Sequence, residues 1–369
     1  MLLDRRSLIA GTAALLPGCA ATGTRPSPIV PAPACLPRVQ ADPSRVIRHV
    51  VGLRPYRPSG FVVRAEALGA TKLVHNYGHG GGGITLSWGS SKLATQLGLP
   101  GHSGPVAVIG AGIMGLTTAR LVQEAGFPVT IYTAALPPDT TSNIAGGQWG
   151  PFSVYRDSAV TPEFRAQFAA ALDYSWRRFQ IMIGDDYGVR WLTTYSEGEA
   201  PPPTAALYPY HPAARSLTAS EHPFPIERLF RYDTMYVETG RFLRQLQQDI
   251  EVSGGRIAIR SFDTPAEIPA LPEKLVFNCT GLGAGKLFGD SELTPIRGQL
   301  AILLPQPEVT YALTADAGYM FPRADGLILG GTFDHGNWST DPDPATAARI
   351  IEAHRDLFSR FRCQGTTES

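Results

Sequence analysis

The glycine-rich turn near residue 110 constrains the fold of this chain more than any other feature. The run from Pro105 to Gly110 has the composition of a buried strand, and Gly110-Ala-Gly112-Ile-Met-Gly115 follows it directly. Apolar and small residues then recur at helical spacing from Leu116 to Ala125, and residues 127–132 predict a second strand. A strand, a G-x-G-x-x-G turn and a helix form a unit that binds a dinucleotide pyrophosphate at the helix N-terminus. We therefore expect an α/β fold with a dinucleotide site.

Each glycine of the turn has its own physical role. The first allows the tight turn, the second lets the backbone approach the pyrophosphate, and the third lets helix and strand pack closely. We assign to cofactor binding Gly110, Gly112, Ile113, Met114 and Gly115. The acidic residue that usually binds the ribose hydroxyls would fall near Thr133 or Ala134 and is absent. Its absence argues against NAD and leaves the adenosine end of a flavin site to other groups.

Composition narrows the class of protein further. With 369 residues, 43% of them hydrophobic, the chain can bury a large core and form about two domains. Its 32 Lys and Arg residues balance 32 Asp and Glu residues, so no net charge recruits nucleic acid or anionic lipid. The 39 glycines and 32 prolines are scattered between hydrophobic runs, as in a loop-rich α/β enzyme. We find no metal-ligand spacing and no Ser/His/Asp constellation in the sequence.

The first residues have the pattern of an export signal. Arg5 and Arg6 precede the apolar run from Leu8 to Leu16, which is too short to cross a bilayer, and small residues follow it. The paired arginines resemble a twin-arginine signal, and Cys19 resembles the lipidated residue of a lipoprotein. Residues 22–34 are expected to form a tether. We expect an exported bacterial protein, periplasmic or anchored through Cys19; the alternative is a buried N-terminal helix.

One long segment identifies a family resemblance. His75-Asn-Tyr-Gly-His-Gly-Gly-Gly-Gly-Ile-Thr-Leu-Ser-Trp-Gly89 closely resembles the signature of D-amino-acid oxidases. Further segments similar to that family are Gly52–Pro58, Thr140–Trp149, Val276–Gly281, Arg297–Gln299, Tyr319–Pro322, Leu329–Phe333 and Gly336–Trp338. These segments are spread across nearly the whole chain after the export signal, and the resemblance implies FAD as the cofactor.

The order of these segments differs from that of the family. In the family the dinucleotide turn opens the chain, whereas here the segments at 52–58 and 75–89 precede it. Joining a residue near 363 to one near 35 restores the usual order, so we interpret the chain as circularly permuted, with Ser90–Pro105 bridging the old ends. The alternative is a damaged or fused reading frame.

The resemblance implies an α/β fold with a Rossmann-type FAD-binding domain and an interleaved, mixed-sheet substrate domain. We expect residues 66–160 and 232–296 in the FAD-binding domain, and residues 35–65, 161–231 and 297–369 in the substrate domain. It also implies further cofactor-binding residues, namely Thr140, Thr141, Ser142, Gly147, Gln148, Thr280, Gly281, Gly80, Gly81, Gly82, Gly83, Ile84 and Thr85. In the last six, backbone N–H groups would face the flavin ring and stabilise its reduced form.

The implied reaction is the oxidation of a D-amino acid by FAD, with dioxygen as acceptor, to a 2-oxo acid, ammonia and hydrogen peroxide. Arg54 would clamp the substrate carboxylate by two hydrogen bonds, and the Tyr319 hydroxyl would share it. Arg57 is expected to be structural, and His75 and His79 to fix their loop by hydrogen bonds. The family's lid tyrosine would fall near Ala315 and is absent. Glycine or sarcosine oxidation, D-aspartate oxidation, and an exported flavoprotein without turnover remain open alternatives.

Restoring the family order also places two cysteines together. Cys35 and Cys363 would lie side by side, and in an oxidising compartment they would form a disulfide that joins the new termini. The alternative is two unrelated cysteines in frayed tails. Cys279, in the apolar segment Val276–Cys279, is expected to be a buried thiol.

Overall fold

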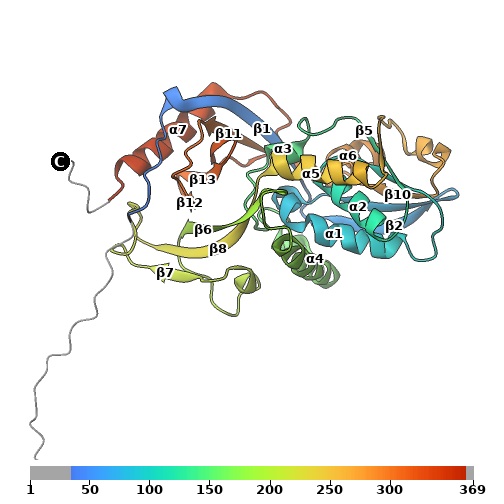
Figure 1. Cartoon of the computed structure of the whole chain (residues 1–369), viewed down its shortest axis with the longest axis horizontal. Coiled ribbons are helices and arrows are strands. Elements are labelled where there is room, and N and C mark those ends of the chain that lie inside the picture. Colours follow the sequence, from blue (N-terminus) through green and yellow to red (C-terminus); the bar gives the residue numbers. More distant parts are fainter. Residues whose placement is uncertain (1–34, 363–369) are drawn as a thin grey trace, which may run out of the picture. The chain divides into compact units, whose positions relative to one another are not determined.

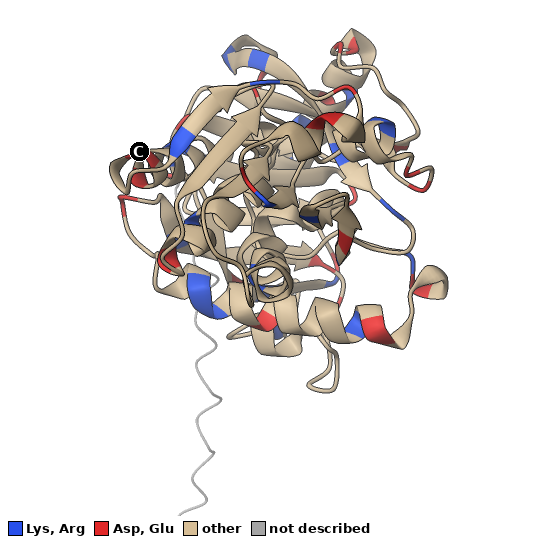
Figure 2. Cartoon of the chain, turned by 90° about the vertical axis from the view of Figure 1, so that its right-hand side faces the viewer, with Lys and Arg blue, Asp and Glu red and all other residues tan. Residues whose placement is uncertain are grey.

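The computed structural model describes residues 35–362, which form two β-sheets and the helices packed on them (Figure 1). The export signal, Cys19 and Cys363 lie outside the described residues, so the predicted signal, lipid anchor and Cys35–Cys363 disulfide stay predictions. None of the helices within residues 35–362 is both long and apolar enough to cross a membrane. Charged residues of both signs are interspersed along the helices and loops (Figure 2), in line with the balanced composition.

The first sheet, here called the parallel sheet, carries the dinucleotide turn. In spatial order its six strands are β2 (Val62–Leu68), β3 (Thr71–Tyr77), β10 (Leu275–Asn278), β4 (Val106–Ile109), β5 (Val129–Thr133) and β9 (Arg256–Ile259). All neighbours are parallel except β2, which pairs antiparallel with β3 at the edge. Every residue of β4 and β10 is buried, as expected for strands covered on both faces.

Helices pack on both faces of the parallel sheet. On one face α1 (Gly83–Gly98), α2 (Ile113–Glu124), α5 (Thr239–Val252) and, packed on α1, α4 (Pro162–Gln180) share one core cluster with the sheet. Phe288 of α6 (Gly283–Phe288) packs instead with the core cluster of the other face. In α5 the fully buried Phe242, Leu243, Leu246 and Ile250 follow the helical period and face the core. A Cβ on Gly89 of α1 would lie 1.8 Å from the Ala171 carbonyl oxygen, so this glycine permits the close crossing of α1 and α4.

The second sheet, here called the long sheet, has nine strands. Its order is β1 (Val46–Tyr56), β11 (Thr294–Leu303), β14 (Gly326–Gly330), β13 (Gly318–Arg323), β12 (Tyr311–Ala315), β6 (Val189–Glu197), β8 (Leu229–Val237) and β7 (Arg215–Leu217), with β15 (Asp334–His335) also on β11. Strand β6 runs parallel to β12, whereas the other pairs are antiparallel, so the sheet is mixed. Helix α7 (Pro344–Ser359) packs against β11, β13 and β14 (Figure 1).

Short helices complete the structure. They are α3 (Thr141–Ile144) and the 3-10 turns η1 (Pro43–Arg45), η2 (Gly80–Gly82), η3 (Asp157–Ala159), η4 (Tyr208–Tyr210) and η5 (Pro265–Ala270). The two ends of the described chain share one core cluster, because Leu36 and Phe361 both pack against its buried side chains.

The predicted fold class is confirmed: a Rossmann-type α/β unit and a second, mixed sheet are both present. The helix after the dinucleotide turn begins earlier than predicted, at Ile113 instead of Leu116, because Gly112 already serves as its N-cap. The Cys279 thiol is buried and free, as predicted. The domain ranges stay a prediction.

Candidate active site

A cavity of about 870 Å³ opens where the parallel strands β3, β4, β5 and β10 end. The carboxyl ends of parallel strands are where α/β sheets bind their ligands. The predicted site residues that line the cavity are Arg54, Tyr319, Gly80, Gly81, Gly83, Ile84, Gly110, Gly112, Ile113, Met114, Thr140, Thr141, Ser142, Gly147, Gln148, Thr280 and Gly281. Gly82, Thr85 and Gly115 do not line it. Segments far apart in the sequence therefore meet at one site.

The dinucleotide turn has the geometry that its glycines predict. Gly110 has φ +109°, and a Cβ there would lie 2.5 Å from the Cys279 carbonyl oxygen. A Cβ on Gly115 would lie 1.8 Å from the carbonyl oxygen of Gly110, so this glycine lets α2 pack on β4. Gly112 caps α2 without a side-chain hydrogen bond, and the Ile113 N–H donates to Ser142 Oγ at 3.0 Å. This open helix N-terminus and its glycine cradle fit the pyrophosphate of FAD.

Thr133 stands at the end of β5, where the acidic residue for the ribose would be expected. Thr133 Oγ1 accepts from the Ala111 N–H at 3.2 Å and donates to the Ala135 carbonyl at 2.7 Å. This side chain therefore braces the dinucleotide turn. Strand β9, the neighbour of β5 in the sheet, ends close to Thr133, since the Arg260 N–H donates to the Thr133 carbonyl at 2.8 Å. The Arg260 guanidinium lies over the Phe262 ring, 4.7 Å from its centroid, and both residues line the cavity at this adenosine end.

The segment from Thr140 to Gln148, here called the flavin-edge loop, is held by hydrogen bonds. Thr140 Oγ1 donates to Asn143 Oδ1 at 2.9 Å, and Gln148 Nε2 donates to the Thr194 hydroxyl at 3.2 Å. Gly147 has φ +96°, and a Cβ there would lie 2.2 Å from the Val237 carbonyl oxygen. The loop can therefore approach β8 closely only with glycine at this position.

The turn between β3 and α1 is tied to residues 150–153. The Gly81 N–H donates to the Ser153 carbonyl at 3.1 Å, and the Gly82 N–H donates to the His79 carbonyl at 3.0 Å. These two N–H groups are therefore satisfied within the protein, whereas α1 begins at Gly83 and leaves its first-turn N–H groups open. Thr85 Oγ1 bonds to Gly150, so its side chain fastens the helix to that segment. Gly80 and Gly81 line the cavity from the turn itself, and Gly83 and Ile84 line it from the first turn of α1.

The two histidines of the signature have different roles. His75 Nδ1 lies 2.9 Å from Asn278 Nδ2, a hydrogen bond that joins β3 to β10. His79 instead stacks on Phe61, with ring centroids 4.8 Å apart, and its Nε2 has no hydrogen-bond partner among the described residues. Burial lowers the pKa of His79 to about 3, so its ring is neutral in the folded protein. The hydrogen bond expected of His75 is present, and His79 contributes mainly by packing.

The lowered pKa of His79 gives a test by pH. Between the folded pKa of about 3 and the unfolded value near 6.5, the unfolded chain binds more protons, so stability falls as pH falls. From pH 7 to pH 4.5 this histidine should remove about 2 to 3 kcal/mol from the free energy of unfolding. In urea titrations His79→Phe, which keeps the stacking on Phe61, should lose less stability than wild type by that amount. The exposed His49→Gln variant should behave as wild type; equal losses for all three proteins would contradict the assignment.

Arg54 lies at the cavity, with its guanidinium held by neutral groups. Its Nη1 donates to the Thr332 carbonyl at 3.2 Å, and its Cζ lies 4.7 Å from the centroid of the Phe333 ring. A Cβ on Gly298, on the adjacent strand β11, would lie 2.5 Å from Nη1, so this glycine lets the guanidinium rest against the backbone. Within residues 35–362 no carboxylate forms an ion pair with Arg54. By contrast, Arg57 pairs with Asp290 at 2.8 Å, as expected of a structural arginine.

Tyr319, which is on strand β13, lies near Arg54. Its ring stacks on Phe321, with centroids 4.7 Å apart and an interplanar angle of 17°. Burial raises the pKa of Tyr319, although the charge of Arg54 acts in the opposite direction, so the hydroxyl stays protonated and can donate. The adjoining hairpin is short: Ala315 pairs with Gly318 across a tight turn, where the family's lid tyrosine would have been expected.

Sequence reasoning missed three residues that contact Arg54, namely Gly298, Thr332 and Phe333. All three belong to segments that resembled the family, but no spacing in the chain shows which residues a cross-strand arginine will meet. The register of β1 on β11, in which Arg54 lies opposite Ile296 and Gly52 opposite Gly298, sets these contacts.

Comparison with known proteins agrees with this geometry. The family described as FAD dependent oxidoreductase matches residues 30–97 and 105–368. A D-amino-acid oxidase of Streptomyces coelicolor is 30% identical over 263 residues, covering 68% of this chain and 76% of the relative. A human D-aspartate oxidase is 29% identical over 258 residues, covering 67% of this chain and 73% of the relative.

The fold also resembles that of a solved oxidase structure. The chain is similar to the crystal structure of glycine oxidase from Geobacillus kaustophilus with a TM-score of 0.50 and 16% identity, over 70% of this chain and 80% of the other. The dinucleotide turn, the open N-termini of α1 and α2 and the size of the cavity fit FAD as the cofactor. By its sequence match and its site, the chain belongs to the family of FAD-dependent oxidoreductases.

Proposed function

We propose that this protein oxidises D-amino acids with FAD and dioxygen, forming imino acids that hydrolyse to 2-oxo acids and ammonia, with release of hydrogen peroxide. The observation that carries the proposal is Arg54: a guanidinium at the cofactor cavity, beside the Tyr319 hydroxyl, without a carboxylate partner among residues 35–362. A planar guanidinium binds a carboxylate by two parallel hydrogen bonds, which suits the α-carboxylate of an amino acid.

Different residues of the site bind the substrate, orient it and exclude water from it. Bound FAD supplies the hydride acceptor of the reaction. Arg54 binds the substrate carboxylate, the Tyr319 hydroxyl donates to the same group, and the apolar Leu300 and Phe321, which also line the cavity, exclude water there. Fixing the carboxylate in this way orients the α-carbon, and such positioning is itself a large part of catalysis. A substrate that binds with a neutral amine needs no side-chain base.

The charges of the cavity favour an amino acid with an uncharged side chain over D-aspartate. Its lining contains three cationic residues, Arg54, Arg260 and Lys286. Arg260 lies beside Thr133 at the adenosine end, and Lys286 pairs with Asp263 at 3.4 Å. A second substrate carboxylate would therefore find no second arginine beside Arg54 in this lining.

A substrate panel tests the proposal. Purified protein loaded with FAD is mixed with D-alanine, D-proline, D-aspartate, glycine, sarcosine and the L-enantiomers, and peroxide is measured. Peroxide with D-alanine or D-proline, and little with D-aspartate or the L-enantiomers, is the expected result. Turnover of glycine or sarcosine alone would replace the proposal by the glycine oxidase alternative. Bound FAD without turnover of any substrate would indicate a flavoprotein that is not an oxidase of these amino acids.

We also propose that the chain is a circular permutation of the family order and that it is exported. The family match falls into two segments that are separated at residues 98–104, within the predicted bridge between the old ends. The packing of Leu36 and Phe361 on one core cluster supports close termini in the described chain. The support for export, to the periplasm or to a membrane through Cys19, is the sequence pattern of residues 1–34.

A further inference from the structure

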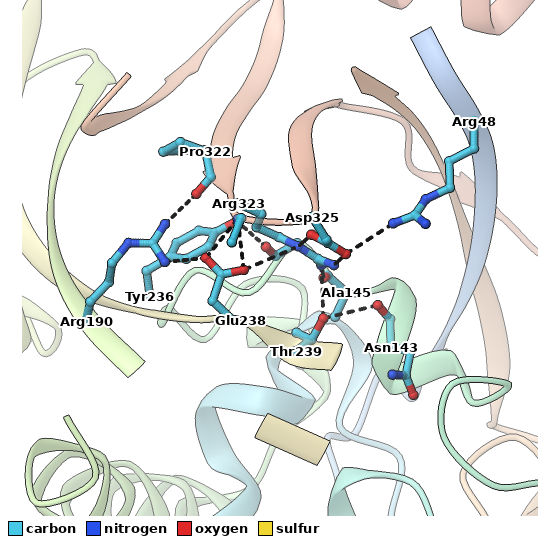
Figure 3. Close-up of polar contacts among 12 residues, drawn as sticks. Arg48, Asn143, Ala145, Arg190, Tyr236, Glu238, Thr239, Pro322, Arg323 and Asp325 are labelled. Carbon is cyan, nitrogen blue, oxygen red and sulfur yellow. Dashed lines mark hydrogen bonds and ion pairs between the residues drawn. The ribbon is translucent and has the colours of Figure 1, made fainter. Parts of the chain in front are cut away.

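A buried arginine at the end of β13 has no part in the site as described so far. Arg323 is 8% exposed, although arginine is rarely buried without partners. Its Nε donates to Asp325 Oδ1 at 2.7 Å, its Nη2 contacts the other oxygen of Asp325, and Glu238 lies 4.0 Å away (Figure 3). The two carboxylates compensate the buried charge. The remaining nitrogen, Nη1, is left to contact other parts of the chain.

That nitrogen holds the flavin-edge loop. Arg323 Nη1 donates to the Ala145 carbonyl at 3.1 Å and to Thr239 Oγ1 at 2.9 Å. Thr239 Oγ1 in turn donates to the Asn143 carbonyl at 3.1 Å, so one guanidinium reaches two loop carbonyls, one of them through a hydroxyl (Figure 3). Ala145 itself lines the cofactor cavity.

Two further carbonyls of this loop are held from strand β8. The Tyr236 hydroxyl donates to the Gly146 carbonyl, and the Val237 N–H donates to the Gly147 carbonyl at 2.8 Å. Arg323 is different because it comes from β13, the strand that carries Tyr319. Its hydrogen bonds therefore join the loop of the cofactor site to the strand of the substrate site.

Alternation along β13 strengthens this connection. Tyr319, Phe321 and Arg323 are two residues apart and lie on one face of the strand. Phe321 stacks on Tyr319, and a Cβ on Gly146 would lie 3.0 Å from the Phe321 ring, so ring and loop are in close contact. One strand face thus carries the tyrosine of the site, the ring that packs on the loop, and the arginine that binds the loop carbonyls.

We propose that Arg323 is a positioning residue that fixes the flavin-edge loop, and thereby the bound FAD, relative to Tyr319. The proposal rests on the proposed function, because it assumes that FAD occupies the cavity. Asp325 and Glu238 orient the guanidinium, and the planar fork lets it bind a carboxylate and a carbonyl at once. A lysine keeps the charge but cannot make both sets of hydrogen bonds.

The test compares the FAD affinity and the flavin spectrum of Arg323→Lys with those of wild type. Flavin-free protein is titrated with FAD by fluorescence, and the visible circular dichroism of the bound flavin is recorded. We expect Kd to rise about tenfold or more, since a charged hydrogen bond to the loop is lost, together with a changed flavin spectrum. Arg48→Ala is the matched control: it removes an ion pair of 3.1 Å to the same Asp325 but touches no loop residue. Its Kd should stay within about twofold of wild type.

A second variant covers the case in which Arg323→Lys does not fold. Thr239→Val removes the hydroxyl between Arg323 and the Asn143 carbonyl and keeps the size of the side chain. It should change Kd and the flavin spectrum in the same direction. Wild-type affinity and spectrum in both variants, or in Thr239→Val when the lysine variant is unfolded, would overturn the inference while wild type still binds FAD. Wild-type protein that binds no FAD would overturn the proposed function and this inference together.

Discussion

Replacing Arg54 by alanine is expected to lower kcat/KM for D-amino acids about a thousandfold or more while FAD stays bound. The guanidinium rests over Gly298 and Phe333 and has no carboxylate partner in residues 35–362, so it is free to bind the substrate. Deleting one partner of a desolvated ion pair costs several kcal/mol, and about 4 kcal/mol corresponds to a thousandfold. Steady-state peroxide kinetics and the absorbance of the bound flavin measure the two quantities.

Two further variants define the specificity of this result. Arg48→Ala, on the exposed part of the same strand, should keep wild-type kcat/KM. Tyr319→Phe should lose roughly ten- to a hundredfold, because it removes one neutral donor to the carboxylate. If Arg54→Ala retained near-wild-type kcat/KM, Arg54 would have no role in substrate binding and the proposed carboxylate clamp would be wrong.

Gly115→Ala is expected to abolish measurable FAD binding and to destabilise the protein by about 3 kcal/mol. The added Cβ would lie 1.8 Å from the Gly110 carbonyl oxygen, a backbone atom that can move only with the dinucleotide turn itself. Helix α2 must therefore shift away from β4, and its N-terminus no longer faces the pyrophosphate. Titration with FAD and urea unfolding of the flavin-free protein provide the measurements.

A glycine elsewhere in a helix provides the control. At Gly240 in α5 the nearest atom to an added Cβ is the flexible end of Arg244, at 3.4 Å. Gly240→Ala should therefore leave FAD affinity unchanged and be neutral or slightly stabilising, since alanine favours the helix. Wild-type FAD affinity in Gly115→Ala would show that the third glycine of the turn is not needed for close packing.

Local patterns in the sequence predict the dinucleotide unit well. Strand β4, the turn at Gly110 and helix α2 follow one another directly, and each has a strong local signal, so their order and type could be predicted. The burial of Cys279 follows from the apolar strand β10 in the same way. The long signature from His75 to Gly89 identified the family, although not the contacts that each of its residues makes.

Contacts between distant segments could not be predicted in this way. Arg54 meets Thr332 and Phe333 because β1 pairs with β11 in one particular register, and a pairing across some 240 residues has no local signal. The role of Arg323 could not be predicted either, because its partners Ala145 and Thr239 come from a loop and a helix start. Its burial depends on carboxylates that only the fold brings together.

The position of β10 in the parallel sheet has a consequence for biosynthesis. This strand lies between β3 and β4, with Leu275 opposite both Lys72 and Val106, so its neighbours leave the ribosome long before it does. Until residue 278 has been synthesised, β3 and β4 lack the strand that joins them, and their apolar edges have no partner. The pyrophosphate cradle, in which Gly110 packs against Cys279, is then also incomplete. Cofactor capture must therefore follow synthesis of about three quarters of the chain, and nascent chains shorter than this leave those edges of β3 and β4 unpaired.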